Sequence, residues 1–266
     1  MASKILVDEL APQSHATDVT ITTGKKIAGD NTQYKITGGA LNEVLQSDGA
    51  GGLTWGGMAG FTAMHFVETD GSTSWTVPAG AKKLLVYLTG GGGAGGGGGP
   101  AGEGSGGGAG GTTVALITVS GNEVTTIEIG AHGTGGTSAD GTAGGDSTFT
   151  YVSGGTSFST VTAKGGTAGR YHAVPTASPA GTVGATNAGI AFYGGMGSPC
   201  GHGTSLGGAS MWGSGGAGGH PSAGGTGHLP FPGLAAGSGG GGGISTAAYR
   251  MSAIGADGCI VIHVFK

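Results

Sequence analysis

Two apolar runs that each accompany a tract of glycine limit what this chain can fold into. Residues 84–88 (LLVYL) are rich in types that suit a buried strand, and the tract at 90–99 is glycine except for one alanine. Residues 260–265 (IVIHVF) form a second such run, downstream of the glycine tract at 239–243. We predict that the two runs pair or share a sheet, and so gather the residues between them into one domain.

Glycine dominates the composition and raises the question of whether the chain folds at all. The chain holds 68 glycines in 266 residues, about a quarter where roughly 7% is usual, and only 9% of its residues are charged. A high glycine content without a period often signals disorder, but disordered chains are usually rich in charge. Collagen is excluded because no stretch keeps glycine at every third position with proline between. The strands that bracket the tracts favour an ordered domain.

The ordered alternatives for the tracts are polyglycine helices with three residues per turn, or glycine-rich loops at the end of a β-sandwich. Glycine loses more backbone entropy on ordering than any other residue, and it has no side chain to bury in return. The backbone N–H and C=O groups of an ordered tract also need partners. Adjacent extended tracts can supply them, so we predict that several tracts lie side by side.

The larger part of the chain has short strand-like runs separated by turn residues, as is typical of an antiparallel sandwich. One hairpin is expected from 112–119 and 124–129, joined by a turn at 120–123. A second hairpin is expected from 147–152 and 157–163. Two further strands are expected at 61–67 and 74–77, and Trp75 is expected in the core. We therefore predict an all-β fold, in which a short trimeric N-terminal shaft precedes a glycine-rich β-sandwich with polyglycine-like tracts and long loops.

Residues 1–60 differ from the rest of the chain, because charges are frequent and the apolar runs are short. Expected strands lie at 5–7, 19–23 and 34–37, and residues 40–46 could be helical or extended. This is too little apolar material for a separate core. We expect the segment to be ordered by trimerisation or by docking onto a larger body. The predicted boundary separates an N-terminal segment, 1–60, from a larger glycine-rich domain, 61–266.

Charge and cysteine content exclude several classes of protein. The net charge is −4, and the only arginines are Arg170 and Arg250, so we predict no nucleic-acid partner. Two cysteines, Cys200 and Cys259, are too few for a disulfide framework. The N-terminus shows no signal-peptide pattern, and no run of about 18 apolar residues exists. We expect a soluble protein that is made in a cytoplasm.

The sequence displays no catalytic motif. It lacks a phosphate-binding G-x-x-x-x-G-K-[ST] loop and a G-x-S-x-G nucleophile elbow. Glycan cleavage needs two carboxylates about 5 to 9.5 Å apart. Asp140 and Asp146 are the only acidic residues near the glycine-rich loops, and we interpret them as turn residues. We predict no enzymatic activity and no cofactor.

Eight histidines invite a metal interpretation, but no H-x-H, C-x-x-C or H-E-x-x-H spacing occurs. Cys200 and His202 alone form a weak pair. On a three-fold axis, His132 or His202 would supply three ligands and could bind a metal between subunits. We favour loop histidines with local hydrogen bonds and predict no metal.

Aromatic and imidazole side chains are scattered through 165–243, a stretch whose only charged side chain is Arg170. Tyrosine and tryptophan give a large contact area at low entropic cost, and glycine and serine give adaptable loops. These rings either form a binding surface at the tips of the loops or fill gaps in the glycine packing. The receptor-binding candidates are Tyr171, His172, Phe192, Tyr193, Trp212, His220 and Phe231. Stacking on sugar rings and contact with an outer-membrane protein would both use them.

Several segments resemble bacteriophage tail fibre proteins. Residues 42–55 (NEVLQSDGAGGLTW) are similar to the V-L-x-S-x-G-x-G-x-L-x-W segment that precedes the distal domain of such fibres. Residues 20–30 resemble short shaft repeats, residues 75–80 with the glycine run after them resemble glycine-rich distal domains, and residues 255–262 resemble the way those domains end. These elements occur in the expected order.

The resemblance implies a homotrimeric virion fibre that is synthesised in the host cytoplasm. Residues 1–60 would be its virion-attachment or shaft segment on the particle, and residues 61–266 its distal domain, facing outward. Ile5, Leu6 and Val7 are then candidates for docking to other tail or baseplate proteins. The distal domain would bind a host surface polysaccharide or outer-membrane protein. Three alternatives are a structural fibre or decoration protein without receptor contact, a depolymerase, and an ice-binding polyglycine bundle. The last should show a regular Gly-x-x period, which this sequence lacks.

Overall fold

The computed structural model of the chain describes the strands at 43–47 and 53–57 and residues 60–99, 103–153, 157–171, 189–199, 205–219, 228–243 and 251–266. The chain divides into two compact units, 1–57 and 58–266, and each is described by itself. The described residues contain no helix, and so none long and apolar enough to cross a membrane.

In the first unit, β1 (Glu43–Ser47) and β2 (Leu53–Gly57) form an antiparallel pair, with Leu45 opposite Trp55. Residues from Glu43 onward are therefore extended, not helical. The expected strands at 5–7, 19–23 and 34–37 lie outside the described residues, as do the docking candidates Ile5, Leu6 and Val7.

The second unit begins with a five-stranded antiparallel sheet in the order β10-β6-β5-β11-β3. Its strands are β3 (Phe61–Val67), β5 (Lys83–Thr89), β6 (Thr112–Thr118), β10 (Ile190–Phe192) and β11 (Cys259–Phe265). β5 and β11 are direct neighbours, and Val86 lies opposite Ile262. The predicted pairing of the two distant apolar runs is confirmed.

A second antiparallel sheet has the order β4-β7-β8-β9. Its strands are β4 (Gly71–Thr76), β7 (Val124–Ile129), β8 (Ser147–Ser153) and β9 (Ser157–Ala163). β8 and β9 pair along their full length, which confirms the predicted hairpin. The all-β fold with two antiparallel sheets is therefore as expected from the sequence.

The core lies between the two sheets and is built by the alternation of side chains along each strand. In β7, Thr125, Ile127 and Ile129 are buried while the residues between them are exposed. Phe149 of β8 is the largest fully buried side chain. Trp75 is only partly buried, at the edge of this core, and its ring stacks on His65 at a centroid distance of 5.2 Å.

The expected hairpin of 112–119 with 124–129 is wrong. β6 pairs with β5 and β10, whereas β7 pairs with β4 and β8 in the other sheet. The turn between them does form, with Gly121 and Asn122 at positive φ, but it carries the chain from one sheet to the other. Both strands bury one face. The alternation of apolar and polar residues identifies that face, but it does not say to which of the two sheets the strand belongs.

The glycine tracts continue from the strands and are held by backbone hydrogen bonds that repeat every three residues. In the tract at 90–97, the N–H groups of residues 90, 93 and 96 donate to the carbonyls of 111, 108 and 105. Those of 91, 94 and 97 donate to 145, 142 and 139, and those of 92 and 95 donate to 256 and 253. Three successive N–H groups therefore point to three different neighbouring tracts, which is the geometry of a helix with three residues per turn.

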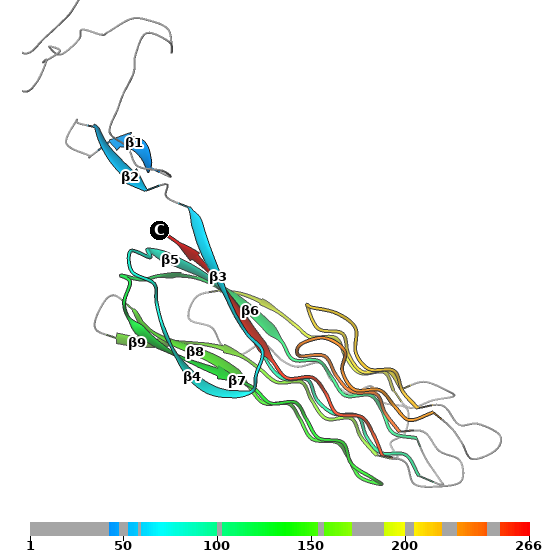
Figure 1. The fold of residues 1–266 in the computed structure, drawn as a ribbon. Helices are drawn as coiled ribbons and strands as arrows, with labels where there is room; N and C mark the ends of the chain where they lie inside the picture. The colour runs from blue at the N-terminus through cyan, green and yellow to red at the C-terminus, as the bar shows by residue number, and fades with distance from the viewer. Residues whose placement is uncertain are drawn as a thin grey trace, which may run out of the picture. The chain divides into compact units, whose positions relative to one another are not determined.

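The carbonyls of the same tract accept from three further tracts. Gly166 and Gly169 donate to it from one side, Gly133 from a second, and Gly240 with Gly243 from a third. Figure 1 shows these tracts running side by side away from the two sheets. The prediction that several tracts lie together is confirmed, and between helices and loops the hydrogen bonds select helices.

Position in the bundle explains the glycine pattern. The tracts at 90–97, 104–111 and 237–243 are buried at every residue and contain only glycine, alanine and serine. In the peripheral tract at 130–137, Gly130 and Gly133 are buried while residues 131, 134 and 137 are exposed and carry side chains. A surrounded tract needs a small residue at all three positions of its turn, whereas a peripheral tract needs one only where it faces inward.

Cys259, the first residue of β11, gives a simple test of the sheet. Burial raises the pKa of its thiol to about 12, with Glu68 adding to the rise and a hydrogen bond to Thr89 opposing it. Because the thiolate is the reactive form, we expect no reaction with Ellman's reagent at about pH 8 in a folded Cys200→Ser variant. The thiol should titrate fully once urea unfolds the chain. Rapid reaction of the folded variant would contradict the buried position.

Candidate functional site

The second unit has two different ends. At the sheet end, the chain enters and leaves together, because Gly60 and Lys266 exchange backbone hydrogen bonds of 3.2 Å in both directions. From β5 and β7 the tracts lead away from the sheets, and later tracts return to β6 and β8. The far end therefore carries the connections between tracts, for example residues 137–140.

At the far end, the described residues place Tyr171 on a fixed support. Its backbone N–H donates to Asp140 Oδ1 at 2.6 Å, and Ala139 accepts from Gly97. Its ring lies against Gly99, where an added Cβ would come within 2.6 Å of the Tyr171 hydroxyl. The half-buried side chain is thus positioned by the ends of three tracts.

Phe231 lies on the tract at 228–233 and is 54% exposed. Its backbone is fixed from both sides, since its N–H donates to Ala217 and its carbonyl accepts from Gly241. The ring therefore projects from a rigid backbone and not from a loose loop. His172 and His220 lie outside the described residues.

Three of the expected tip residues lie where the five-stranded sheet meets the glycine tracts, and not at the far end with Tyr171. Phe192 ends β10 opposite Thr112, and Tyr193 follows it directly with 71% of its surface exposed. Trp212 sits in a turn closed by a hydrogen bond from Ser210 to Gly213, and its indole N–H donates to Thr89 Oγ1 at 2.8 Å. Of the described candidates, Tyr171 lies at the far end, and Phe231 lies partway along the bundle, since its partner Gly241 is beside Gly95. The other three lie at the junction of sheet and tracts.

Trp212 closes one side of an apolar groove on the solvent-facing side of the five-stranded sheet. Its ring meets the edge of Tyr87 at a centroid distance of 6.5 Å, and Tyr87 in turn contacts His263. The groove has a volume of about 350 Å³ and is lined by Met64, Phe66, Tyr87, Met211, Trp212, Val261 and His263. Its lining offers apolar contact and little polar surface.

The sequence analysis did not identify the groove, although a signal was present. An antiparallel sheet with one wet face should alternate between apolar and polar residues. β11 and β3 are apolar on both faces, with Val261 and Phe265 on one side and Ile260 and Ile262 on the other. Because the second face of these strands is also apolar, we expect that face to contact something other than water.

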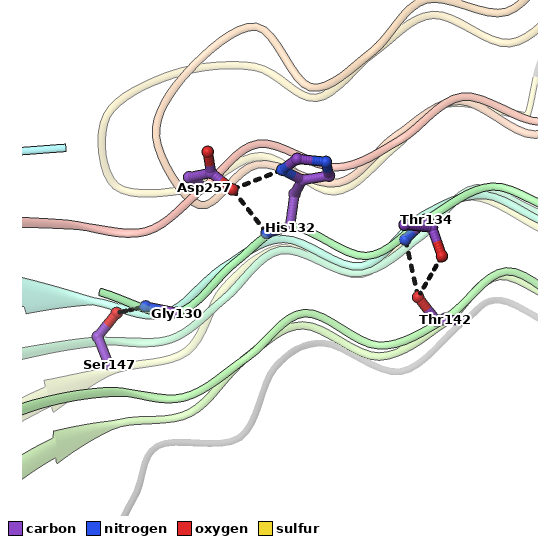
Figure 2. Close-up of polar contacts among 6 residues, drawn as sticks. All are labelled: Gly130, His132, Thr134, Thr142, Ser147 and Asp257. Carbon is purple, nitrogen blue, oxygen red and sulfur yellow. Dashed lines mark hydrogen bonds and ion pairs between the residues drawn. The ribbon is translucent and has the colours of Figure 1, made fainter. Parts of the chain in front are cut away.

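His132 has a local hydrogen-bond partner in Asp257. Figure 2 shows its ring beside Asp257, whose Oδ1 lies 2.5 Å from Nδ1 and accepts the His132 backbone N–H at 2.7 Å. The favoured interpretation, a local hydrogen bond, therefore fits His132. Among the described residues, no group of three or more His, Cys, Asp or Glu side chains could hold a metal ion; His202 is not among them.

The same region shows how side chains tie neighbouring tracts together (Figure 2). Ser147 Oγ accepts from Gly130 at 2.9 Å, and Thr142 Oγ1 accepts from the Thr134 N–H at 2.7 Å. The first bond is buried, and the second lies at the exposed surface of the bundle. They supplement the backbone lattice and form no catalytic arrangement.

The two aspartates considered for glycan cleavage hold the scaffold together. Asp146 pairs with Lys164 at 2.5 Å and accepts from Gly165, while Asp140 accepts from Tyr171. They lie six residues apart along an extended tract, which at roughly 3.1 Å per residue is about 19 Å. That separation exceeds the range in which two carboxylates act on one glycosidic bond.

His65 predicts a pH dependence of stability. Burial lowers the pKa of its imidazole, so the unfolded chain binds the proton more tightly and stability falls as the pH drops below about 6.5. A His65→Phe variant keeps a ring against Trp75 and removes the titration. We expect its free energy of unfolding in urea to fall less between about pH 7.5 and about pH 5.5 than that of the wild type. Equal losses in both proteins would contradict this.

The fold defines a class of protein: an all-β domain in which backbone-bonded glycine tracts extend from a two-sheet sandwich. The chain belongs to the glycine-rich domain family, whose profile matches residues 68–265 and thus nearly all of the second unit. No curated protein matches the chain.

Proposed function

We propose that this chain is a bacteriophage tail fibre protein, assembled as a homotrimer, whose glycine-rich domain binds a receptor on the host surface without chemical turnover. One observation carries the proposal: the domain is attached at one end and displays connections at the other. Gly60 and Lys266 meet at the sheet end. The tracts hold the far end away from this attachment, as a protein that presents a surface requires.

The far-end construction suits adhesion for a second reason. Binding surfaces gain from residues that are already fixed in place, because less entropy is lost on contact. Tyr171 at the far end projects from backbone held by neighbouring tracts, and so does Phe231 partway along the bundle. Affinity would be multiplied by avidity across three subunits and several fibres. The N-terminal segment would dock on tail or baseplate proteins, and the receptor would be a polysaccharide or an outer-membrane protein.

The proposal is tested with the full chain, labelled with a fluorescent dye, on a panel of bacterial strains that differ in surface polysaccharide and outer-membrane proteins. We expect saturable labelling of some strains. A Tyr171→Ala variant should bind at least about tenfold more weakly, as for an aromatic anchor at an interface. Val124→Ala removes an apolar side chain at the sheet end that is 60% exposed, and it should bind like the wild type.

Two outcomes would contradict the proposal. Absence of saturable labelling on every strain would favour a structural fibre or decoration protein. Release of sugar from envelope preparations by the purified chain would show turnover and favour a depolymerase. If Val124→Ala weakens binding and Tyr171→Ala does not, the receptor site lies at the sheet end.

A further inference from the structure

We propose that the solvent-facing side of the five-stranded sheet, here called the outer face, is a surface through which copies of this chain associate. Strand register places its side chains in two rows. One row crosses all five strands: Phe66, Val261, Tyr87, Val114 and Ile190. The second row comprises Met64, His263, Leu85 and Leu116. Neither row contains a carboxylate, a lysine or an arginine.

The apolar side chains of this face are widely exposed. Phe61 contacts His263 and extends the face at one corner, and Trp212 with Met211 borders it at another. The exposed fractions are Phe61 59%, Met64 61%, Phe66 49%, Leu116 57%, Ile190 67%, Phe192 45%, Met211 49% and Trp212 39%. At roughly 200 Å² for each fully exposed side chain, this amounts to on the order of 850 Å² of apolar surface.

That area matches what a stable interface buries on each partner, about 800 Å², and exceeds the largest apolar patch of a typical monomer, about 300–600 Å². Transient interfaces are no more apolar than the rest of a protein surface, whereas permanent interfaces between identical chains resemble a core cut in half. Two uncharged rows with an aromatic centre resemble a permanent interface between identical chains.

A second copy is the partner that these properties favour. An apolar surface of this size is an aggregation hazard for as long as it faces water. Another copy of the chain is present from synthesis onward, while a receptor is met only later. The two rows offer no charge for a differently charged partner to complement, so identical rows meet without repulsion. Lys83, which lies on the same face opposite Phe265, is outside both rows. The inference concerns assembly and does not depend on whether the far end binds a host.

The test measures thiol labelling of the full chain, so it does not depend on what the first unit contributes to assembly. In a Cys200→Ser background, Phe66→Cys reports on the outer face. Leu234→Cys, at a residue 69% exposed and outside both sheets, is the matched control. We expect maleimide to label position 66 at least about tenfold more slowly than position 234, because a covered thiol reacts only when the interface opens. Met64→Cys repeats the measurement if Phe66→Cys does not fold.

A second substitution then disrupts the proposed interface. Adding Leu116→Asp places a carboxylate in the face, where a buried unpaired charge opposes association. Labelling at position 66 should rise to the rate of the control, while circular dichroism shows that the fold is kept. Equal labelling at 66 and 234 without this change would overturn the proposal, as would continued protection of 66 with it. Protection that arises only after host membranes are added would assign the face to a foreign partner and also overturn it.

Discussion

A Gly92→Ala substitution should be among the most destabilising additions of a single methyl to the described part of this chain. An added Cβ at residue 92 would lie 1.9 Å from the Ser238 carbonyl oxygen and 2.4 Å from its carbon. Both atoms belong to backbone that is itself held in the lattice, so neither can move aside cheaply. We expect the free energy of unfolding to fall by about 4 kcal/mol or more, as for severe overpacking. The melting temperature should fall by about 8 °C or more.

Gly60→Ala is the matched control, because the same methyl at residue 60 meets no atom within 4 Å and the backbone there needs no positive φ. It should change stability by less than about 0.5 kcal/mol. Ala94 and Ala109 show that the buried tracts accept a methyl at particular positions, since both are fully buried. A Gly92→Ala variant that melts like the wild type would mean that the central tracts are not packed against one another.

Phe149→Ala should have the second largest effect, through the sandwich and not through the glycine lattice. Phe149 is fully buried, and its ring stacks on Tyr151 at a centroid distance of 5.9 Å. Truncation removes transfer free energy and leaves a cavity that neighbouring strands cannot fill. We expect a loss of about 3–5 kcal/mol in urea unfolding.

Val124→Ala supplies the comparison for this prediction, because Val124 lies on β7 of the same sheet but is 60% exposed. The free energy of unfolding of the Val124→Ala variant should fall by less than about 0.5 kcal/mol. If Phe149→Ala were equally mild, the space between the two sheets would not be the core of the domain. A Phe149→Leu variant should lie between the two, since it retains part of the buried volume.

The sequence allowed the framework of the fold to be predicted but not the assignment of strands to sheets. Apolar runs near residues 86 and 262 were recognisable because both are short, mostly apolar and close to glycine. The hairpin of β8 and β9 was recognisable from its turn. The path from β6 to β7 was not, because a turn with Gly121 and Asn122 serves equally well for a hairpin or for a crossing between sheets.

The candidate site was harder to predict, because the position of an aromatic residue along a glycine tract leaves no mark in the sequence. Trp212 and Phe231 both stand among glycine and proline, yet one touches the end of β5 and the other lies on a tract. The absent Gly-x-x period was also misleading. Surrounded tracts are glycine-rich at every position, so the period appears only in peripheral tracts such as the one at 130–137.

The three-residue repeat of the hydrogen bonds sets a rule for how such a protein can change over evolution. Inserting or deleting three residues in a tract shifts its length by one turn and leaves every later N–H aimed at the tract it met before. Inserting or deleting one or two residues rotates the rest of the tract by a third or two thirds of a turn. Its later N–H groups then no longer point at their partner tracts. Lineages should therefore vary these segments in triplets, while the stretches that join them at the tip tolerate any length.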